Sequence, residues 1–236
     1  MDTFLIVLEY IGMFAFSASG AMVAIDKEVD YIGVLLMSLV TCFGGGIMRD
    51  ILLGCTPPRF FTEFAPFIIV CVCTTVVVII FATVFKRAFI NYEKRINDVN
   101  NVVDALGLGA FAVGGVVISV ESGFTSPLVA ITMGIISSVG GGLTRDLILR
   151  DIPFILRKRI YILASLLGAS LYYVLAVTLK FDALISCIIG VVSTFILRIL
   201  ATIFKWNIPK AIDFAKLEAI MRKENEASAQ NSEENK

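Results

Sequence analysis

The chain contains no histidine, and only 17% of its 236 residues are charged. The absence of histidine excludes a Ser-His-Asp triad and removes half of the usual ligands of a mixed zinc site. There are five cysteines, of which all but one lie inside apolar stretches, where a thiol packs as a small hydrophobe: Cys42, Cys55, Cys71, Cys73 and Cys187. We therefore expect no enzyme, no metal centre and no cofactor.

Charge of either sign is also scarce, because 20 basic residues balance 20 acidic ones. No basic patch with interleaved aromatic residues occurs, so we expect no nucleic-acid partner. The apolar fraction is 58% and the mean hydropathy is +0.89, whereas a soluble domain has about 45–50% apolar and about 25% charged residues. The composition predicts an integral membrane protein.

Seven apolar stretches are long enough to cross a bilayer. They predict an all-α membrane protein in which the first residues begin the first span and are not a cleaved signal peptide. The expected spans are 4–25, 31–54, 65–85, 101–120, 126–149, 160–179 and 183–203.

One motif occurs twice, near the ends of the second and fifth spans. Residues 44–50 read GGGIMRD and residues 140–146 read GGGLTRD. Each glycine costs about 1 kcal/mol in a helix interior relative to alanine. Each charge costs about 2.5–3.5 kcal/mol at the centre of a membrane. A sequence that accepts both costs twice in the same order indicates a functional element.

The duplication extends beyond the glycines. Residues 9–12 align with residues 104–107, and Pro57 aligns with Pro153, at an offset of about 95 residues with one gap. Each unit contains three spans, so the second unit enters the membrane inverted relative to the first, as in many transporters. We expect repeats at 1–90 and 98–180, a seventh helix at 181–206 and a tail at 207–236.

Lysine and arginine residues predict the orientation, since they concentrate in cytoplasmic links. They cluster between spans 3 and 4, between spans 5 and 6 and after span 7, whereas the opposite links carry only Arg59 and Lys180. The N-terminus is then expected outside, and the C-terminus in the cytoplasm.

The glycine triplets have two compatible interpretations. They can allow two helices to pack closely, because small residues let backbones approach in membranes. They can also break the helix and free carbonyl groups, which a membrane tolerates only beside protein or a wet cavity.

The Arg-Asp pairs also have two interpretations. Adjacent residues on a helix point about 100° apart, so we expect Arg49 to pair with a carboxylate of the other repeat, and Arg145 likewise. Alternatively, these charges lie at helix ends and extend to the membrane surface.

Two further carboxylates, Glu9 and Asp104, occupy equivalent positions in spans 1 and 4. Glu9 lies nearly two turns into the membrane, whereas Asp104 could also serve as a helix-start residue. Nearby hydroxyl groups could contact an ion or bond their own helix backbone. The complete set of candidate pore or substrate residues is Glu9, Ser17, Thr41, Gly44, Gly45, Gly46, Arg49, Asp50, Asp104, Ser138, Gly140, Gly141, Gly142, Arg145 and Asp146.

Two GGGxxRD motifs on the second and fifth of seven spans resemble the prokaryotic relatives of the trimeric intracellular cation (TRIC) channels. The same duplicated domain is also described as a glycine transporter domain, and the resemblance covers residues 3–203. It implies a homotrimer in a prokaryotic plasma membrane, with a potassium-permeable path in each protomer lined by kinked second and fifth helices. The animal members of this family use lysines and phosphoinositide contacts near the pore. Spans 2 and 5 of this chain contain no lysine, so we do not expect phosphoinositide regulation, whereas contacts with other membrane lipids are expected.

Two functions follow as alternatives. In a channel for potassium or another monovalent cation, carbonyl and hydroxyl oxygens and Glu9 would replace water around the ion. In a transporter of glycine or a similar amino acid, an arginine would hold the carboxylate. Glu9 or Asp104 would hold the ammonium group.

Overall fold

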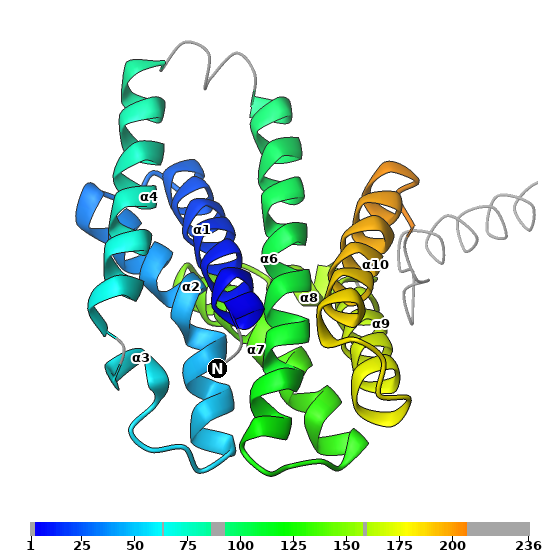
Figure 1. Cartoon of the computed structure of the whole chain (residues 1–236). Coiled ribbons are helices and arrows are strands. Elements are labelled where there is room, and N and C mark those ends of the chain that lie inside the picture. Colours follow the sequence, from blue (N-terminus) through cyan, green and yellow to red (C-terminus); the bar gives the residue numbers. More distant parts are fainter. Residues whose placement is uncertain (1–2, 63, 86–92, 158–159, 207–236) are drawn as a thin grey trace, which may run out of the picture. The chain divides into compact units, whose positions relative to one another are not determined.

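The computed structural model describes residues 3–62, 64–85, 93–157 and 160–206 of the chain. All regular structure within these residues is helical (Figure 1). The elements are α1 (Thr3–Asp26), α2 (Tyr31–Leu52), α3 (Arg59–Thr62), α4 (Phe64–Val84), α6 (Glu93–Glu121), α7 (Pro127–Ile148), α8 (Phe154–Arg157), α9 (Ile160–Tyr172), η1 (Tyr173–Thr178) and α10 (Ala183–Ile203).

The described residues include seven helices that are long and apolar enough to cross a membrane, which confirms the predicted spans. The largest difference is at α6, which starts at Glu93 and not near residue 101. The sixth span consists of α9 and the π-helical turn η1, which continues it. The predicted tail at 207–236 lies outside the described residues.

Local signals set where the helices begin. The Asp30 carboxylate accepts a hydrogen bond of 2.7 Å from the Gly33 N–H and so caps α2. Asp182 caps α10 in the same way, through the Ile185 N–H at 2.9 Å. Pro127 occupies the first turn of α7, where its missing N–H costs nothing.

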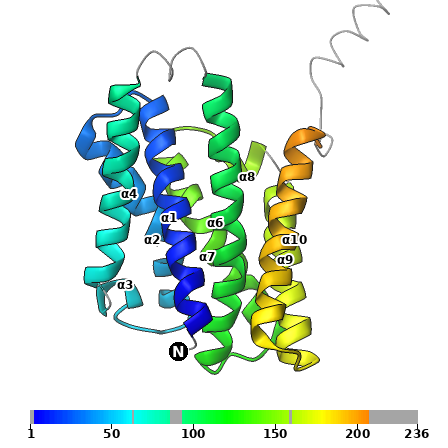
Figure 2. The same cartoon turned by 45° about the horizontal axis from the view of Figure 1, so that its top comes forward.

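The two repeats run in opposite directions through the bundle, as the duplication predicts. The first consists of α1, α2 and α4, and the second consists of α6, α7 and α9. The end that carries α3, the α6–α7 loop and the η1–α10 turn is called the α3 end. The end that carries the α1–α2 loop, α8 and the first turn of α6 is called the α8 end (Figures 1 and 2).

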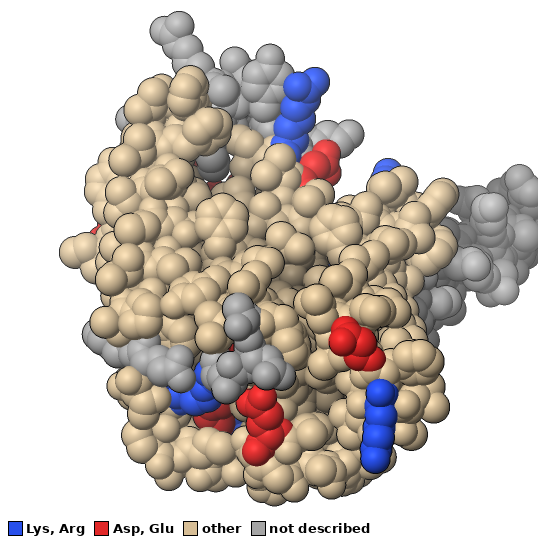
Figure 3. Space-filling view, viewed as in Figure 1, with Lys and Arg blue, Asp and Glu red and all other residues tan. Residues whose placement is uncertain are grey.

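The repeats meet through their equivalent helices, because α1 packs on α6 and α2 packs on α7. Phe16 and Phe111, which occupy equivalent positions, lie with their ring centroids 5.1 Å apart between α1 and α6. The outer helices bury much less of their surface, and only 22% of the α4 span is inside the bundle. Few charged side chains interrupt the face in Figure 3. The chain is a membrane protein whose polar groups gather inside the bundle.

Candidate functional site

The two glycine triplets lie where α2 crosses α7. Both helices continue through the glycines without interruption, so the interpretation as a helix break is wrong. A Cβ atom on Gly45 would collide with the carbonyl oxygen of Ser137, and one on Gly141 would collide with that of Thr41. The middle glycines therefore allow the two backbones to touch, as the packing interpretation predicts.

The outer glycines of each triplet have different surroundings. A Cβ atom on Gly44 would lie 3.3 Å from the Cα atom of Gly141, and one on Gly140 would lie 3.0 Å from that of Gly45. A Cβ atom on Gly46 would instead lie 3.8 Å from Nη2 of Arg49, and one on Gly142 would lie 3.9 Å from Nη2 of Arg145. The third glycine thus leaves space beside a guanidinium group.

Each arginine of the motif pairs with the aspartate that follows it. Nε and Nη2 of Arg49 donate to Asp50 Oδ1 at 2.8 and 2.6 Å. The same atoms of Arg145 donate to Asp146 Oδ1 at 2.9 and 2.7 Å. The expected pairing of each arginine with a carboxylate of the other repeat is wrong. Neighbouring residues point about 100° apart on a helix, but the arginine side chain is long enough to curve around the helix and reach the next residue. Arg49 Nη1 donates a hydrogen bond of 3.2 Å to Ser137 Oγ of the other repeat.

Burial excludes the alternative that these charges extend to the membrane surface, since both arginines are only 5% exposed.

The second oxygen of each aspartate accepts a hydrogen bond from a backbone N–H of the segment that follows. The N–H of Arg59 donates to Asp50 Oδ2 at 2.9 Å, and that of Phe154 donates to Asp146 Oδ2 at 2.7 Å. Arg59 is thus the counterpart of Phe154, and Pro58 replaces Pro57 as the counterpart of Pro153.

Glu9 lies at the α3 end and forms a salt bridge with Arg59. Nη1 of Arg59 lies 2.9 Å from Glu9 Oε1, and the two side chains are 20% and 12% exposed. Arg59 therefore connects the first helix of the repeat, through its side chain, with Asp50, through its backbone N–H. The sequence assigned no role to Arg59, although it is one of only two basic residues in the links on that side.

Asp104 occupies the equivalent place in the second repeat, near the α8 end, and is 7% exposed. Its Oδ1 atom accepts a 3.4 Å hydrogen bond from Ser19 Oγ, whereas Oδ2 accepts none from the described residues. The charges of Arg198 and Arg145 and the hydroxyl group of Tyr161 act on this carboxylate. Asp104 is therefore a buried group and not an exposed helix start.

Most of the candidate hydroxyl groups bond to their own helices. Thr41 Oγ1 donates to the Met37 carbonyl at 2.6 Å, and Ser138 Oγ donates to the Ile135 carbonyl at 3.0 Å. The hydroxyl of Ser17 has no hydrogen-bond partner among the described residues. These groups mainly satisfy the helix backbone.

Two cavities flank the crossing of α2 and α7, and they are equivalent by the repeat. The cavity at the α8 end has a volume of about 250 Å³ and includes Asp104, Arg145 and Asp146 in its lining. The cavity at the α3 end has a volume of about 40 Å³ and includes Glu9, Arg49 and Asp50. The charged candidate residues thus form two half-sites that the crossing glycines separate.

Side-chain size explains the difference in volume between the cavities. Phe43 and Phe60 line the smaller cavity, and the residues at the equivalent positions of the larger cavity are Val139 and Ile155. The two phenylalanine rings pack with their centroids 4.4 Å apart. Aromatic rings therefore fill at one end the space that is empty at the other.

Comparison with known proteins gives the family of the chain. The sequence model of the family described as "Glycine transporter" matches twice, at residues 6–83 and 101–177. The chain belongs to this family. It is also 32% identical to the UPF0126 membrane protein YvgT of Bacillus subtilis, over 86% of this chain and 94% of that protein. The inner membrane protein YadS of Escherichia coli K12 is 32% identical, over 85% and 92%.

Solved structures of TRIC channels share the fold of this family member. The TRIC orthologue from Rhodobacter sphaeroides is 32% identical with a TM-score of 0.77, over 87% of this chain and all of that chain. A structure that describes conductance through TRIC cation channels is 33% identical with a TM-score of 0.74, over 88% and 97%. The family and the arrangement of seven helices in two inverted repeats and a seventh helix are therefore confirmed.

Two residues of the site, Arg198 and Tyr161, could not be assigned from the motif. Arg198 is the only charged residue of α10, and a charge inside an apolar span signals a function. Tyr161 has no comparable signal, because a tyrosine at the start of a span is also a common membrane-interface residue.

Proposed function

We propose that this protein is a channel for monovalent cations, chiefly potassium, with one path in each protomer. The path runs along α2 and α7 and joins the two cavities. The observation that carries the proposal is the lining of the larger cavity, where four aspartates accompany two basic residues: Asp26, Asp104, Asp146 and Asp151 with Lys27 and Arg145. A wet, carboxylate-rich cavity attracts cations and raises their local concentration.

The ion pairs leave this excess of negative charge in place. Arg145 neutralises Asp146, and Lys27 lies 2.8 Å from Asp151. Asp26 and Asp104 remain on the lining beside three asparagines, Asn97, Asn100 and Asn101. Carboxylate and amide oxygens suit the coordination of a hard cation, so this end of the path fits the entry of potassium better than that of an anion.

The arginines of the motif do not oppose this role, because their charge is compensated locally. Arg49 and Arg145 each donate two N–H groups to one aspartate oxygen. A permeating cation therefore meets two nearly neutral pairs and no free guanidinium of the motif. A cation path beside two buried arginines requires that their positive charges be neutralised, and the two aspartates do this.

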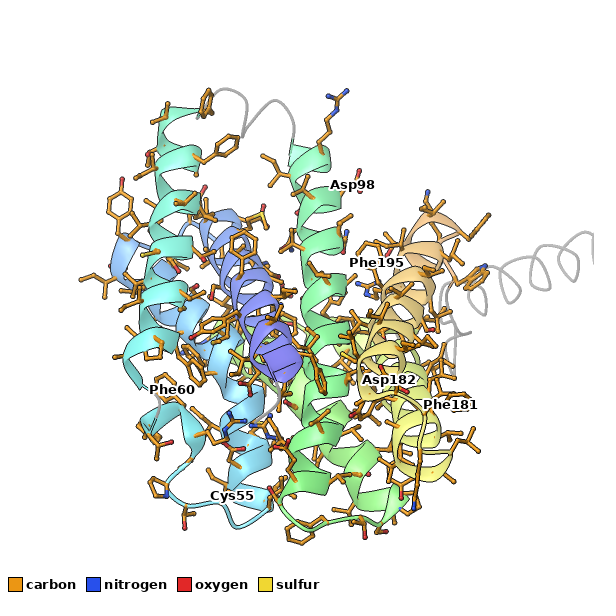
Figure 4. The ribbon with its side chains drawn as sticks, in the orientation of Figure 1. Cys55, Phe60, Asp98, Phe181, Asp182 and Phe195 are labelled. Carbon is orange, nitrogen blue, oxygen red and sulfur yellow. The ribbon has the colours of Figure 1, made fainter. Side chains whose placement is uncertain are left out.

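The α3 end of the path is narrow. Phe43, on α2, and Phe60, on α3, line the same small cavity as Glu9 and Arg59, and Phe60 lies near the point where α3 meets the end of α4 (Figure 4). Two carboxylates and two guanidinium groups line this cavity, so its charge is balanced. We infer that opening the path requires a displacement of Phe60 and of the salt bridge.

The relatives support the remaining parts of the proposal. Solved relatives are described as trimeric and as cation channels, which supports a homotrimer. The relative from Escherichia coli is an inner membrane protein, which supports a prokaryotic plasma membrane. Lys27, Arg95 and Arg150 lie at the α8 end, so the positive-inside rule favours that end as cytoplasmic. The N-terminus would then lie outside and the C-terminus in the cytoplasm.

One observation also favours transport of glycine or a similar zwitterion. Arg145 and Asp104 line the same cavity, and neither Nη1 of Arg145 nor Oδ2 of Asp104 has a hydrogen-bond partner among the described residues. A free donor on a cation and a free acceptor on a carboxylate match the two ends of a small amino acid. The two functions differ in whether a current flows without the solute.

The test is reconstitution of the purified protein in liposomes and planar bilayers. The channel predicts unitary potassium currents without any added solute, and a lower conductance for Asp26→Asn, with Asp30→Asn at the α2 cap as the matched control. Saturable glycine uptake without unitary currents would overturn the channel and support the transporter. Light scattering coupled to size-exclusion chromatography would measure the proposed trimer.

A further inference from the structure

Arg198 is a charged residue in the last third of a membrane helix, α10, that lies outside the duplication. It is 1% exposed and is among the largest fully buried side chains of the described residues. It shares the buried face of α10 with Thr194 and Ala201. A buried charge in a membrane span is costly and usually functional, so its position requires a partner inside the bundle.

The surroundings of Arg198 belong to the larger cavity. Its guanidinium carbon lies 4.9 Å from the ring centroid of Phe154 and 5.2 Å from that of Tyr161, and both of these residues line the cavity. Nη1 donates to Thr202 Oγ1 at 2.9 Å. Nε and Nη2 have no hydrogen-bond partner among the described residues, although such buried donors are rarely left unsatisfied.

Asp104 is the carboxylate whose surroundings connect to this guanidinium. It lines the same cavity as Phe154 and Tyr161, and these are the two rings on which Arg198 stacks. The Oδ2 atom of Asp104, like two of the Arg198 donors, has no direct partner in the described part of the chain. The two rings therefore connect the guanidinium of Arg198 with the cavity that Asp104 lines.

The first repeat contains the same arrangement with a different source of positive charge. There, Glu9 is paired with Arg59 at 2.9 Å. Phe154 is the counterpart of Arg59 by its backbone bond to the motif aspartate, and it carries no charge. The second repeat therefore lacks an arginine for Asp104 at this position, and the guanidinium of Arg198 stacks on the ring that replaced it.

We propose that Arg198 does for Asp104 what Arg59 does for Glu9, and that the seventh helix completes the second half-site. Arg198 acts through Asp104 and is thus a positioning residue that sets the electrostatic potential of the path near the α8 end. The effect on conduction rests on the proposed channel function, whereas the compensation between the two side chains does not.

Conductance of reconstituted channels at low KCl concentration tests this role. Arg198→Gln leaves Asp104 uncompensated and should raise the low-salt conductance by at least about twofold, because a negative charge concentrates potassium. Asp104→Asn should lower it by a similar factor, and the double variant should return towards the native value. Arg198→Lys keeps the charge but not the stacked guanidinium, so it should change the conductance less than Arg198→Gln does. All differences should shrink at high KCl, where charges are screened.

Shifts of the same sign in both single variants, or a double variant that keeps the raised conductance of Arg198→Gln, would overturn the proposal. Thermal unfolding in detergent provides a readout that needs no current. The double variant should lose less melting temperature than the two single variants together, and simple additivity would overturn the pairing. If the native protein carries no current, the channel function fails, and the unfolding measurements alone decide the role of Arg198.

Discussion

The buried pair of Arg145 and Asp146 allows a sharp test of what holds the candidate site together. Asp146→Asn keeps the shape of the side chain but removes the charge that two arginine N–H groups contact at 2.9 and 2.7 Å. Arg145 is 5% exposed, and its Nη1 already lacks a described partner. Breaking a buried ion pair on one side typically costs 3–5 kcal/mol, so we expect a loss of about 3 kcal/mol.

Two further variants test whether this loss of stability comes from the burial of the ion pair. Asp151→Asn removes a pair whose side chains are 40% and 25% exposed, and such pairs contribute about 0–1 kcal/mol. The double variant Arg145→Met with Asp146→Leu replaces both charges by apolar groups, which is often close to neutral. Unfolding of detergent-purified protein, followed by intrinsic fluorescence at increasing denaturant, measures all three.

The expected order of stability places Asp151→Asn and the double variant close to the native protein, and Asp146→Asn far below it. Equal stability of Asp146→Asn and Asp151→Asn would refute the argument from burial. A double variant that folds but carries a changed potassium conductance would show that the pair serves conduction as well as folding. A double variant with native conductance would leave the pair a structural role alone.

Three more predictions concern the crossing of the helices and the two cavities. Gly45→Ala should lower the free energy of unfolding by about 1–3 kcal/mol, because the new Cβ atom would collide with a backbone carbonyl group. Gly46→Ala introduces only ordinary contacts and should stay within about 1 kcal/mol of the native protein. Chemical unfolding of both variants measures the difference. Phe43→Val should enlarge the α3-end cavity and increase the unitary conductance. Phe81 is 55% exposed on the outside of the bundle, so the control variant Phe81→Val should leave the conductance unchanged. Asp26→Asn combined with Phe43→Val should give a conductance below that of Phe43→Val alone in bilayer recordings.

The sequence predicted the spans and the inverted repeat because hydropathy and the span count report them directly. Helix ends agree within a few residues, except where α6 extends back to Glu93. The polar residues before residue 101 conceal this extension, because a helix beyond the apolar stretch leaves no hydropathy signal. The packing of the glycines was one of two open alternatives, since composition alone does not distinguish a break from a close approach.

The contacts of the site were predicted less well, for a physical reason. The angle of about 100° between neighbouring helical residues describes the directions of their Cβ atoms. An arginine side chain is long enough to bring its guanidinium group back to the neighbouring carboxylate in spite of that angle. The second oxygen of each aspartate is held by a backbone N–H eight or nine residues further along, and this bond helps to fix the carboxylate beside the arginine. No spacing rule contains that bond, because it depends on how the segment after the helix turns back.

The two halves have kept their charges and diverged in volume. Each retains a carboxylate on its first helix, an Arg-Asp pair and one further arginine, even though that arginine comes from α3 in one half and from α10 in the other. Phe43 and Phe60 nevertheless reduce one cavity to about 40 Å³, while Val139 and Ile155 leave about 250 Å³ in the other. Because the charges that line the α3-end cavity are balanced, we expect the barrier to permeation at that end to be steric. We therefore expect side-chain size at these positions to govern opening, with the buried charges holding the helices in register while the rings move.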